Sequence, residues 1–304
     1  PSYVNRMNVL IAGNITKEYS GRVLLDRASF SLQEGEKVGV IGANGKGKST
    51  LLRIIAGIEE PDEGSVITGN HVKIGYLPQT PFFAEEETVL SAALRDVIEN
   101  PEDFEKESEA KSLLGRMDFT GFEQPLEELS GGQRKRVALV HVLLQPVDIL
   151  VLDEPTNHLD SAMSGWLEEY LIRFRRTLVM VTHDRYFLDR VSTRIVEVDR
   201  GCVCSYPGSY SKYVQLKKES LNMEQASERK RLSILRTELQ WLARGARARS
   251  TKQKAHIQRI KDMQSVISSQ KQIKIEMSSI VSRMGKKTME AREVCKSYGG
   301  RTII

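Results

Sequence analysis

A glycine-rich stretch between two apolar segments restricts the possible fold more than any other feature of the sequence. Residues 38–41 form a short apolar run of the kind found in buried strands. The sequence GANGKGKS follows at 42–49, and apolar residues then recur at helical spacing up to Ala56. A strand, a glycine-rich turn and a helix in this order predict a loop whose backbone N–H groups surround a phosphate.

The loop also carries the side chains that a nucleotide bound with magnesium requires. Lys48 is predicted to neutralise the β- and γ-phosphates, and the Ser49 hydroxyl is predicted to ligate Mg2+. The predicted nucleotide contacts are Gly42, Ala43, Asn44, Gly45, Lys46, Gly47, Lys48, Ser49 and Thr50.

Two further apolar runs end in residues that suit phosphate hydrolysis. Asp148–Leu152 leads into Asp153 and Glu154, and residues 177–181 lead towards His183. Runs this apolar suit strands that helices cover on both faces, so a mostly parallel sheet in an α/β domain is predicted. Asp153 is predicted to hold the magnesium shell, and Glu154 to orient or deprotonate the attacking water. A solvated turn is the alternative for the acidic pair taken alone.

Polar helical sequence interrupts and then follows this core. Residues 79–130 predict a helical subdomain inserted at about 80–145. After Tyr213 glycine and proline nearly vanish, and apolar residues at helical spacing on either side of 244–249 predict an antiparallel helical hairpin. Two helices of about 30 residues would each reach roughly 45 Å, so the hairpin is expected to project.

Charge and repetition mark the end of the chain. Residues 217–287 hold 18 Lys/Arg against 6 Asp/Glu, whereas the rest of the chain holds 27 against 34, so one segment carries the basic character. Residues 294–304 repeat 15–25 in register at an offset of 279. The chain is therefore expected to end inside a second copy of its first domain.

Membrane, secretory and metal-cluster classes find no support in the sequence. No run of about 18 apolar residues occurs and residues 1–13 lack a secretory pattern, so a soluble, cytoplasmic protein without membrane contact is expected. Three cysteines without a Cys/His cluster are interpreted as free thiols, and no metal is assigned to them.

The sequence LSGGQ at 129–133, followed by RKR, resembles the signature of the ATP-binding cassette (ABC) family, and the resemblance spans residues 1–210. It implies that ATP is the nucleotide and that hydrolysis requires Mg2+. It also implies that Tyr19 stacks on adenine, although a packing role is the alternative. Gln79 would sense the metal and the attacking water, and His183 would contact the γ-phosphate. Ser130, Gly131, Gly132 and Gln133 would contact the ATP held by a partner domain, with Asp160 in the adjoining D-loop.

Three segments narrow the resemblance to the ABC-F subfamily: TNHLD at 156–160, YPGSYSKY at 206–213 and WLARGARARSTKQKA at 241–255. The resemblance implies a first cassette at 1–213, a basic interdomain linker at 214–287 and the start of a second cassette at 288–304. It implies binding to the ribosome, with linker residues facing rRNA and tRNA, in translation control or antibiotic resistance. These linker residues are Arg244, Arg247, Arg249, Lys252 and Lys254.

Several alternatives remain open on the sequence alone. The hairpin could be a solvated coiled coil that only spaces two domains, or the chain could be the ATPase subunit of a membrane transporter. A DNA-repair ATPase is disfavoured because it would split the cassette with longer coiled coils or zinc modules. The resemblance implies that a single cassette holds half of each ATP site, so weak hydrolysis is expected unless a head-to-tail homodimer forms.

Overall fold

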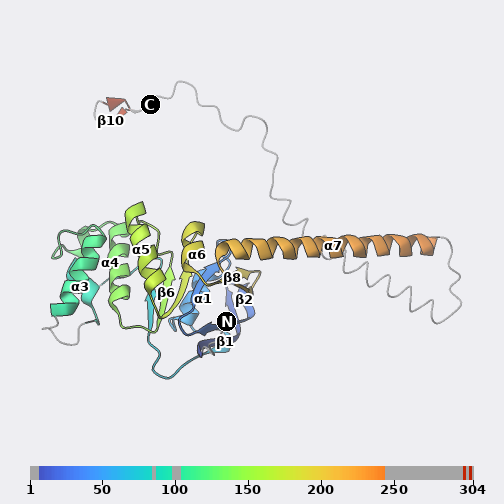
Figure 1. Cartoon of the computed structure of the whole chain (residues 1–304), viewed down its shortest axis with the longest axis horizontal. Helices are drawn as coiled ribbons and strands as arrows, with labels where there is room; N and C mark the ends of the chain where they lie inside the picture. The colour runs from blue at the N-terminus through green and yellow to red at the C-terminus, as the bar shows by residue number, and fades with distance from the viewer. Residues whose placement is uncertain (1–6, 84–86, 98–103, 244–296, 299–300, 303–304) are drawn as a thin grey trace. The chain divides into compact units, whose positions relative to one another are not determined.

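The computed structural model describes residues 7–83, 87–97, 104–243, 297–298 and 301–302 (Figure 1). The chain divides into two compact units, residues 1–219 and 220–304, which are described separately. In chain order the elements are β1 (Asn8–Tyr19), β2 (Arg22–Gln33), β3 (Lys37–Ile41), α1 (Lys48–Ile55), β4 (Glu63–Thr68), β5 (Ile74–Leu77), α2 (Val89–Leu94), α3 (Phe104–Arg116), the 3-10 helix η1 (Leu126–Glu128), α4 (Gly131–Leu144), β6 (Ile149–Asp153), α5 (Ser161–Arg173), β7 (Thr177–Val181), α6 (Arg185–Val191), β8 (Arg194–Asp199), β9 (Cys202–Pro207), α7 (Tyr210–Ala243), β10 (Ser297–Tyr298) and β11 (Arg301–Thr302).

The main sheet of the first unit has the strand order β5-β6-β7-β3-β8-β9. Every neighbouring pair runs parallel except β8 and β9, which form an antiparallel edge. The mostly parallel α/β sheet predicted from the apolar runs is therefore confirmed.

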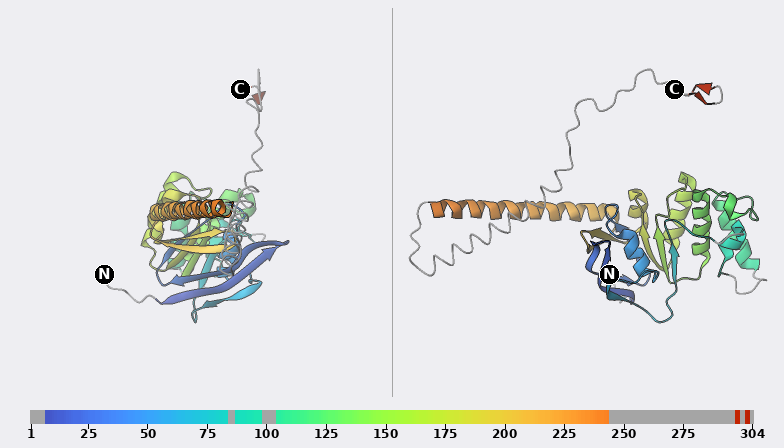
Figure 2. Two further views of the ribbon diagram at one scale, coloured as in Figure 1. Left: turned by 90° about the vertical axis from the view of Figure 1, so that its right-hand side faces the viewer. Right: turned by 180° about the vertical axis from the view of Figure 1, so that it is seen from behind.

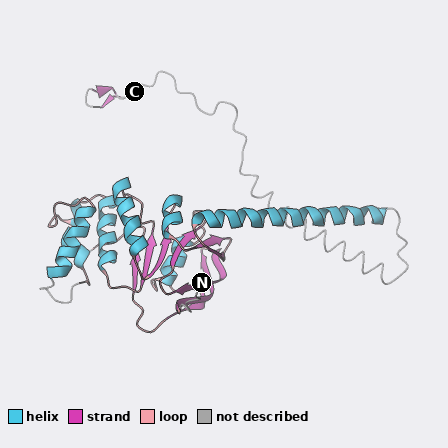
Figure 3. Ribbon diagram, in the orientation of Figure 1, coloured by secondary structure: helices cyan, strands magenta, loops and turns pink. Residues whose placement is uncertain are grey.

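Alternate residues of the central strands enter two different hydrophobic cores. In β6, Ile149 and Val151 pack into a core shared with α1, whereas Leu150 and Leu152 pack into a core shared with α4, α5 and α6. Figure 1 shows β6 between α5 and α1, and Figure 3 shows helices on both sides of these strands. All four side chains are fully buried, and each stabilises the fold by about 2 kcal/mol. A strand buried on both faces explains the unbroken apolar run in the sequence.

A second sheet of three antiparallel strands, in the order β2-β1-β4, forms a separate layer. Figure 2 shows its long strands β1 and β2, drawn in blue, apart from the main sheet. Leu10, Ile15 and Leu25 bury their side chains in the core that contains α1. The sequence analysis did not predict this sheet.

Helices α2, α3 and α4 lie between β5 and β6 along the chain, where the helical insertion was expected. Ala110 and Leu114 of α3 and Val137 of α4 are fully buried in one core with Leu150 of β6. The insertion therefore packs onto the same face of the main sheet as α5.

The short hairpin of β10 and β11 repeats the register of the first hairpin in the chain. Tyr298 pairs with Arg301, and Ser297 pairs with Thr302. In the first hairpin Tyr19 pairs with Arg22, and Glu18 pairs with Val23. Each pair is offset by the 279 positions of the sequence repeat, so the repeated segments form the same local structure.

Helix α7 covers the first part of the predicted basic linker. The second predicted helix and the basic stretch 244–254 lie outside the described residues. Among the helices that are described, none combines the length and apolar character needed to cross a membrane.

The start of α7 is tied to β8 by one carboxylate. Lys217 Nζ lies 2.6 Å from Glu197 Oε2, and the Tyr213 hydroxyl donates to Glu197 Oε1 at 3.0 Å. Burial and this carboxylate raise the pKa of the Tyr213 hydroxyl, which therefore stays protonated as a donor. Glu197 pairs in the sheet with Ile41, the residue before the glycine-rich loop. The first turns of α7 are thus fixed next to the glycine-rich loop.

Replacing Glu197 with alanine should loosen the first turns of α7, because Tyr213 and Lys217 lose their shared acceptor. We expect amide hydrogen exchange over residues 210–219 to accelerate on the order of tenfold, equal to about 1.4 kcal/mol. Mass spectrometry of exchanged peptides measures this. Glu219→Ala, which removes an exposed carboxylate from the same helix, should have no effect. Equal exchange in both variants would contradict the anchoring role of Glu197.

Candidate nucleotide-binding site

The glycine-rich loop between β3 and α1 depends on two glycines that no other residue can replace without strain. Gly42 has a φ of +154°, and a Cβ at this position would lie 2.4 Å from the carbonyl oxygen of Val198. Gly47 caps α1 with a φ of +94°, and its Cβ would lie 3.3 Å from the carbonyl oxygen of Leu24 in β2. Strand β2 of the antiparallel sheet therefore packs closely against the loop. The N–H groups at the start of α1 are the positive end of its dipole.

A cavity of about 410 Å³ opens beside the loop, at the carboxyl ends of β5, β6 and β7. Parallel strands commonly form ligand sites at this edge. The predicted site residues that line it are Asn44, Gly45, Gly47, Lys48, Ser49, Thr50, Gln79, Asp153, Glu154 and His183.

Lys48 is held by the loop itself. Its Nζ donates to the carbonyl oxygens of Gly42 at 2.9 Å and Ala43 at 3.3 Å. Burial lowers the pKa of Lys48, and the negative charges of Glu154 and Asp153 partly offset this effect. The ammonium is thus fixed and poorly hydrated, which strengthens its attraction for an anion in the cavity.

Two carboxylates at the end of β6 have oxygens that fit a metal ion. Asp153 Oδ1 and Glu154 Oε2 are buried and have no hydrogen-bond partner within the described residues. A buried carboxylate oxygen is costly unless it is paired or bound to a metal. Both residues share the cavity with the Ser49 hydroxyl, so this set of oxygen donors fits Mg2+.

Glu154 and His183 form a pair at the end of β6 and β7. Glu154 has a φ of +53°, and its N–H donates to the Val181 carbonyl at 2.8 Å. His183 Nε2 lies 3.3 Å from Glu154 Oε1, and the His183 side chain is largely exposed. Burial raises the pKa of Glu154, while His183 opposes this rise. A carboxylate with raised pKa beside a histidine is suited to accept a proton from water.

Four predicted nucleotide contacts lie outside this cavity. Gly42 and Ala43 line a neighbouring cavity next to Lys48, and Lys46 Nζ lies 3.7 Å from Asp199. The Tyr19 hydroxyl donates to Glu59 and accepts from Arg53, and its side chain does not line the cavity. The stacking role of Tyr19 stays a prediction.

The signature residues sit at the start of α4 and do not line the cavity either. The Ser130 hydroxyl accepts from the Gln133 N–H at 3.3 Å, and the Ser130 N–H donates to the Gln133 side chain at 2.9 Å. This capping box uses the N–H groups of Ser130 and Gln133, and the N–H groups of Gly131 and Gly132 lie between them in the first turn of α4. A Cβ on Gly132 would lie 3.0 Å from the Cβ of His158, so the motif packs closely on the segment after β6.

Asp160 begins α5, where its Oδ1 accepts from the Met163 N–H at 2.8 Å. It is therefore a helix cap, and its place in a D-loop contact stays a prediction. The linker residues Arg244, Arg247, Arg249, Lys252 and Lys254 lie outside the described residues.

The sequence analysis missed Lys135, which is only 4% exposed. Its Nζ donates to the Asp153 carbonyl at 3.2 Å and so joins the signature helix α4 to β6. Burial lowers its pKa, and the Asp153 and Glu154 charges oppose this effect. Lys135 occupies an apolar helical stripe with Leu139 and Val142, and a lysine in such a stripe is a signal that could have identified it. Asn157 and Leu24, which line the cavity, were missed as well.

Comparisons with known proteins agree with this geometry. Two family models, both described as ABC transporter, match residues 25–157 and 196–280. The Energy-dependent translational throttle protein EttA of Haemophilus influenzae is 36% identical over 93% of this chain and 58% of its own length. The EttA of Mycobacterium tuberculosis is 32% identical over 95% of this chain and 59% of its own length. The chain belongs to the ABC-F subfamily of ATP-binding cassette proteins.

Another relative of similar identity is named as uncharacterized. The uncharacterized ABC transporter ATP-binding protein YfmR of Bacillus subtilis is 37% identical over 98% of this chain and 53% of its own length. The chain thus spans about half the length of the curated relatives it matches.

Solved structures show the same cassette fold. The ATP binding subunit of an ABC transporter superposes with a TM-score of 0.60 at 23% identity, over 66% of this chain and 90% of that chain. A dimeric cassette in a post-hydrolysis state, bound to ADP and Pi, superposes with a TM-score of 0.57 at 26% identity. The match covers 65% of this chain and 98% of that chain. The chain is therefore an ATP-binding protein of the cassette type.

Substitution of two lysines of the loop should have very different effects on the affinity for ATP. Lys48→Ala should weaken ATP binding on the order of 10–100-fold, because a charge-assisted contact to phosphate is lost. Lys46→Ala serves as the control and should change affinity less than threefold, because Lys46 pairs with Asp199 outside the cavity. Isothermal titration with MgATP measures both. Equal losses in the two variants would place the phosphates elsewhere.

Lys135 should stabilise the fold through both its stem and its ammonium. Lys135→Ala should lower the free energy of unfolding by about 2 kcal/mol, because packing and the bond to Asp153 are lost. Lys135→Met keeps the volume of the stem and removes a desolvated charge, so its loss should be smaller. Urea unfolding followed by circular dichroism measures both values. Two variants with wild-type stability would show that Lys135 does not join α4 to β6.

Proposed function

We propose that this chain is the first cassette and linker of a twin-cassette ATPase that acts on the ribosome. The observation that carries the proposal is the cavity at the carboxyl ends of β5, β6 and β7. It combines a phosphate loop, a histidine, and two carboxylates whose buried oxygens have no partner in the described part of the chain. Similarity to the two EttA proteins, which are named as translational throttle proteins, supports the cellular target.

Hydrolysis would follow from the positions of the side chains. The amides of the loop and the Lys48 ammonium would hold the β- and γ-phosphates. Magnesium, held by Ser49 and Asp153, would neutralise charge on the phosphate oxygens. Glu154 would take a proton from the water that attacks the γ-phosphorus, and Gln79 would orient that water. His183, 3.3 Å from Glu154, would contact the γ-phosphate and position the carboxylate.

A second cassette would complete the site. The amides at the start of α4 lie away from the cavity of their own domain, so they are available to the γ-phosphate bound by a partner. The dimeric cassette bound to ADP and Pi supports this pairing. The repeat at 294–304, with its matching hairpin register, supports a second cassette in the same protein. A head-to-tail homodimer of this chain would supply the same contacts.

The linker would provide the contact with rRNA and tRNA. Residues 217–287 carry 18 Lys/Arg against 6 Asp/Glu, and such a balance suits phosphate backbones. The second family model matches residues 196–280, so proteins of this family share most of this segment. A membrane-transporter subunit, the second candidate, is favoured by the name of the matching family and by the similar transporter subunit of known structure, but such a subunit has no use for a basic linker.

Blocking proton abstraction should trap the ATP-bound complex on the ribosome. In the protein that contains both cassettes, Glu154→Gln with the matching change in the second cassette should slow hydrolysis about 100-fold. The variant should cosediment with ribosomes when ATP is present and not when ADP is present. Glu127→Gln, an exposed position in η1, is the control.

Cosedimentation at moderate salt separates the candidate functions. Binding to membranes or DNA instead of ribosomes would overturn the proposal. Translation control and antibiotic protection differ in a further way. Protection would let a susceptible host grow on ribosome-targeting antibiotics when it expresses the intact protein.

A further inference from the structure

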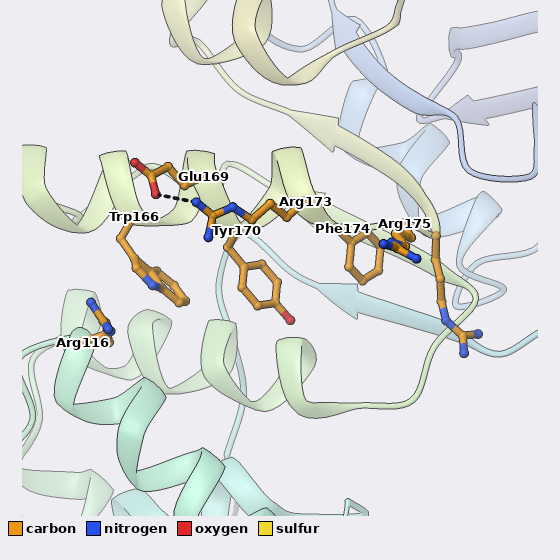
Figure 4. Close-up of a pocket in the computed structure, with 8 residues that line it drawn as sticks. Arg116, Trp166, Glu169, Tyr170, Arg173, Phe174 and Arg175 are labelled. Atoms are coloured by element: carbon orange, nitrogen blue, oxygen red, sulfur yellow. Dashed lines mark ion pairs between the residues drawn. The ribbon is translucent and has the colours of Figure 1, made fainter.

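A second cavity, of about 510 Å³, lies between α5 and the end of α3, and it shares no lining residue with the nucleotide cavity. Figure 4 shows aromatic rings along α5 and guanidinium groups around them. The lining residues that the argument uses are Arg116, Trp166, Tyr170, Arg173, Phe174 and Arg175.

The aromatic rings form a row because they recur every four residues, two on one face of α5 and the third, Phe174, at its C-cap. The ring centroids of Trp166 and Tyr170 are 5.4 Å apart, and those of Tyr170 and Phe174 are 6.5 Å apart. All three side chains are half-buried and pack against the hydrophobic core. The Tyr170 hydroxyl donates to the Leu143 carbonyl at 3.4 Å, which fixes its ring. The row therefore forms the apolar part of the cavity lining.

Positive charge exceeds negative charge around this row. Four arginines and one glutamate line the cavity. Arg173 Nη2 lies 3.5 Å from Glu169 Oε2, but both side chains are exposed, so this pair is weak. Arg176 pairs with Asp148. Within the described residues, Arg116 and Arg175 form no ion pair, so the cavity attracts anions.

Positive and negative side chains divide between two adjoining cavities, which together form a longer groove. A neighbouring cavity of about 640 Å³ shares Arg116 and Trp166 and continues towards Asp118 and Asp160. Asp118 and Asp160 line only the neighbouring cavity and would repel phosphate there, whereas Arg173 and Arg175 line only the first cavity. An anionic ligand with an apolar planar group would place its charge on the arginines and its plane on the rings.

We infer that this groove binds a segment of single-stranded RNA, with a backbone phosphate on the arginines and an unstacked base on the aromatic row. Bases stack on aromatic side chains and on guanidinium planes, and arginine binds phosphate through two parallel hydrogen bonds. The cavity has the volume of a site for one small planar ligand. An acidic peptide satisfies the charge but offers no base for the rings. The inference does not rest on the proposed function of the ATP site.

Tryptophan fluorescence tests the inference at the site itself. The chain has two tryptophans, Trp166 and Trp241, so Trp241→Phe leaves Trp166 as the sole reporter. A mixed-sequence, ten-nucleotide single-stranded RNA should quench this fluorescence as a base stacks on the ring. The double variant Arg173→Gln with Arg175→Gln should lower the RNA affinity measured from this quenching at least tenfold. The slope of log affinity against log salt should fall by about 0.7 for the one lost phosphate contact.

Matched controls separate the groove from the basic linker and from the ATP site. Arg22→Gln with Arg27→Gln removes two exposed arginines from β2 and should leave the quenching unchanged. ATP affinity should be equal in all variants, because the two cavities share no residue. Failure of RNA to quench Trp166, or equal quenching in the two arginine pairs, would overturn the inference. Tighter binding of a glutamate-rich peptide than of RNA at Trp166 would overturn it as well.

Discussion

The parallel register of β6, β7 and β3 is the constraint on which the site depends. Val181 of β7 pairs with Asp153 of β6 on one side and with Val40 of β3 on the other. This register brings the acidic pair, His183 and the glycine-rich loop to one edge of the sheet. A slip of one residue would turn the alternating side chains of β6 into the wrong cores. The two cores therefore fix the chemistry at the edge as well as the fold.

Buried charge at the site is the second constraint, and four side chains carry it there. Lys48, Lys135, Asp153 and Glu154 are each at most 9% exposed. Charges removed from water destabilise a fold unless they are close to opposite charges. Here the two cations and two anions act on one another, as the opposing effects on the pKa values of Lys48 and Lys135 show. These four fixed charges fit a phosphate and a divalent cation, and burying them costs the fold stability.

Sequence patterns predicted the parts of the site that short segments define. The loop 42–49 and the acidic end of β6 could be predicted because strand, turn and helix signals are local. The second sheet could not, because register shifts along β1 interrupt the alternation of its side chains. Lys135 looked like one more basic residue of the signature segment until the fold placed it against Asp153. The groove beside α5 is lined by Arg116 and by residues 173–176. These residues are far apart in the sequence, and only the packing of α3 near α5 brings them together.

A structure of the chain with Mg2+ and a non-hydrolysable ATP analogue tests the central claim most directly. The triphosphate should lie along the amides of the loop, with the Lys48 ammonium on the β- and γ-phosphates and the metal between Ser49 and Asp153. Phosphates bound elsewhere, for example on the arginines of the groove beside α5, would contradict it.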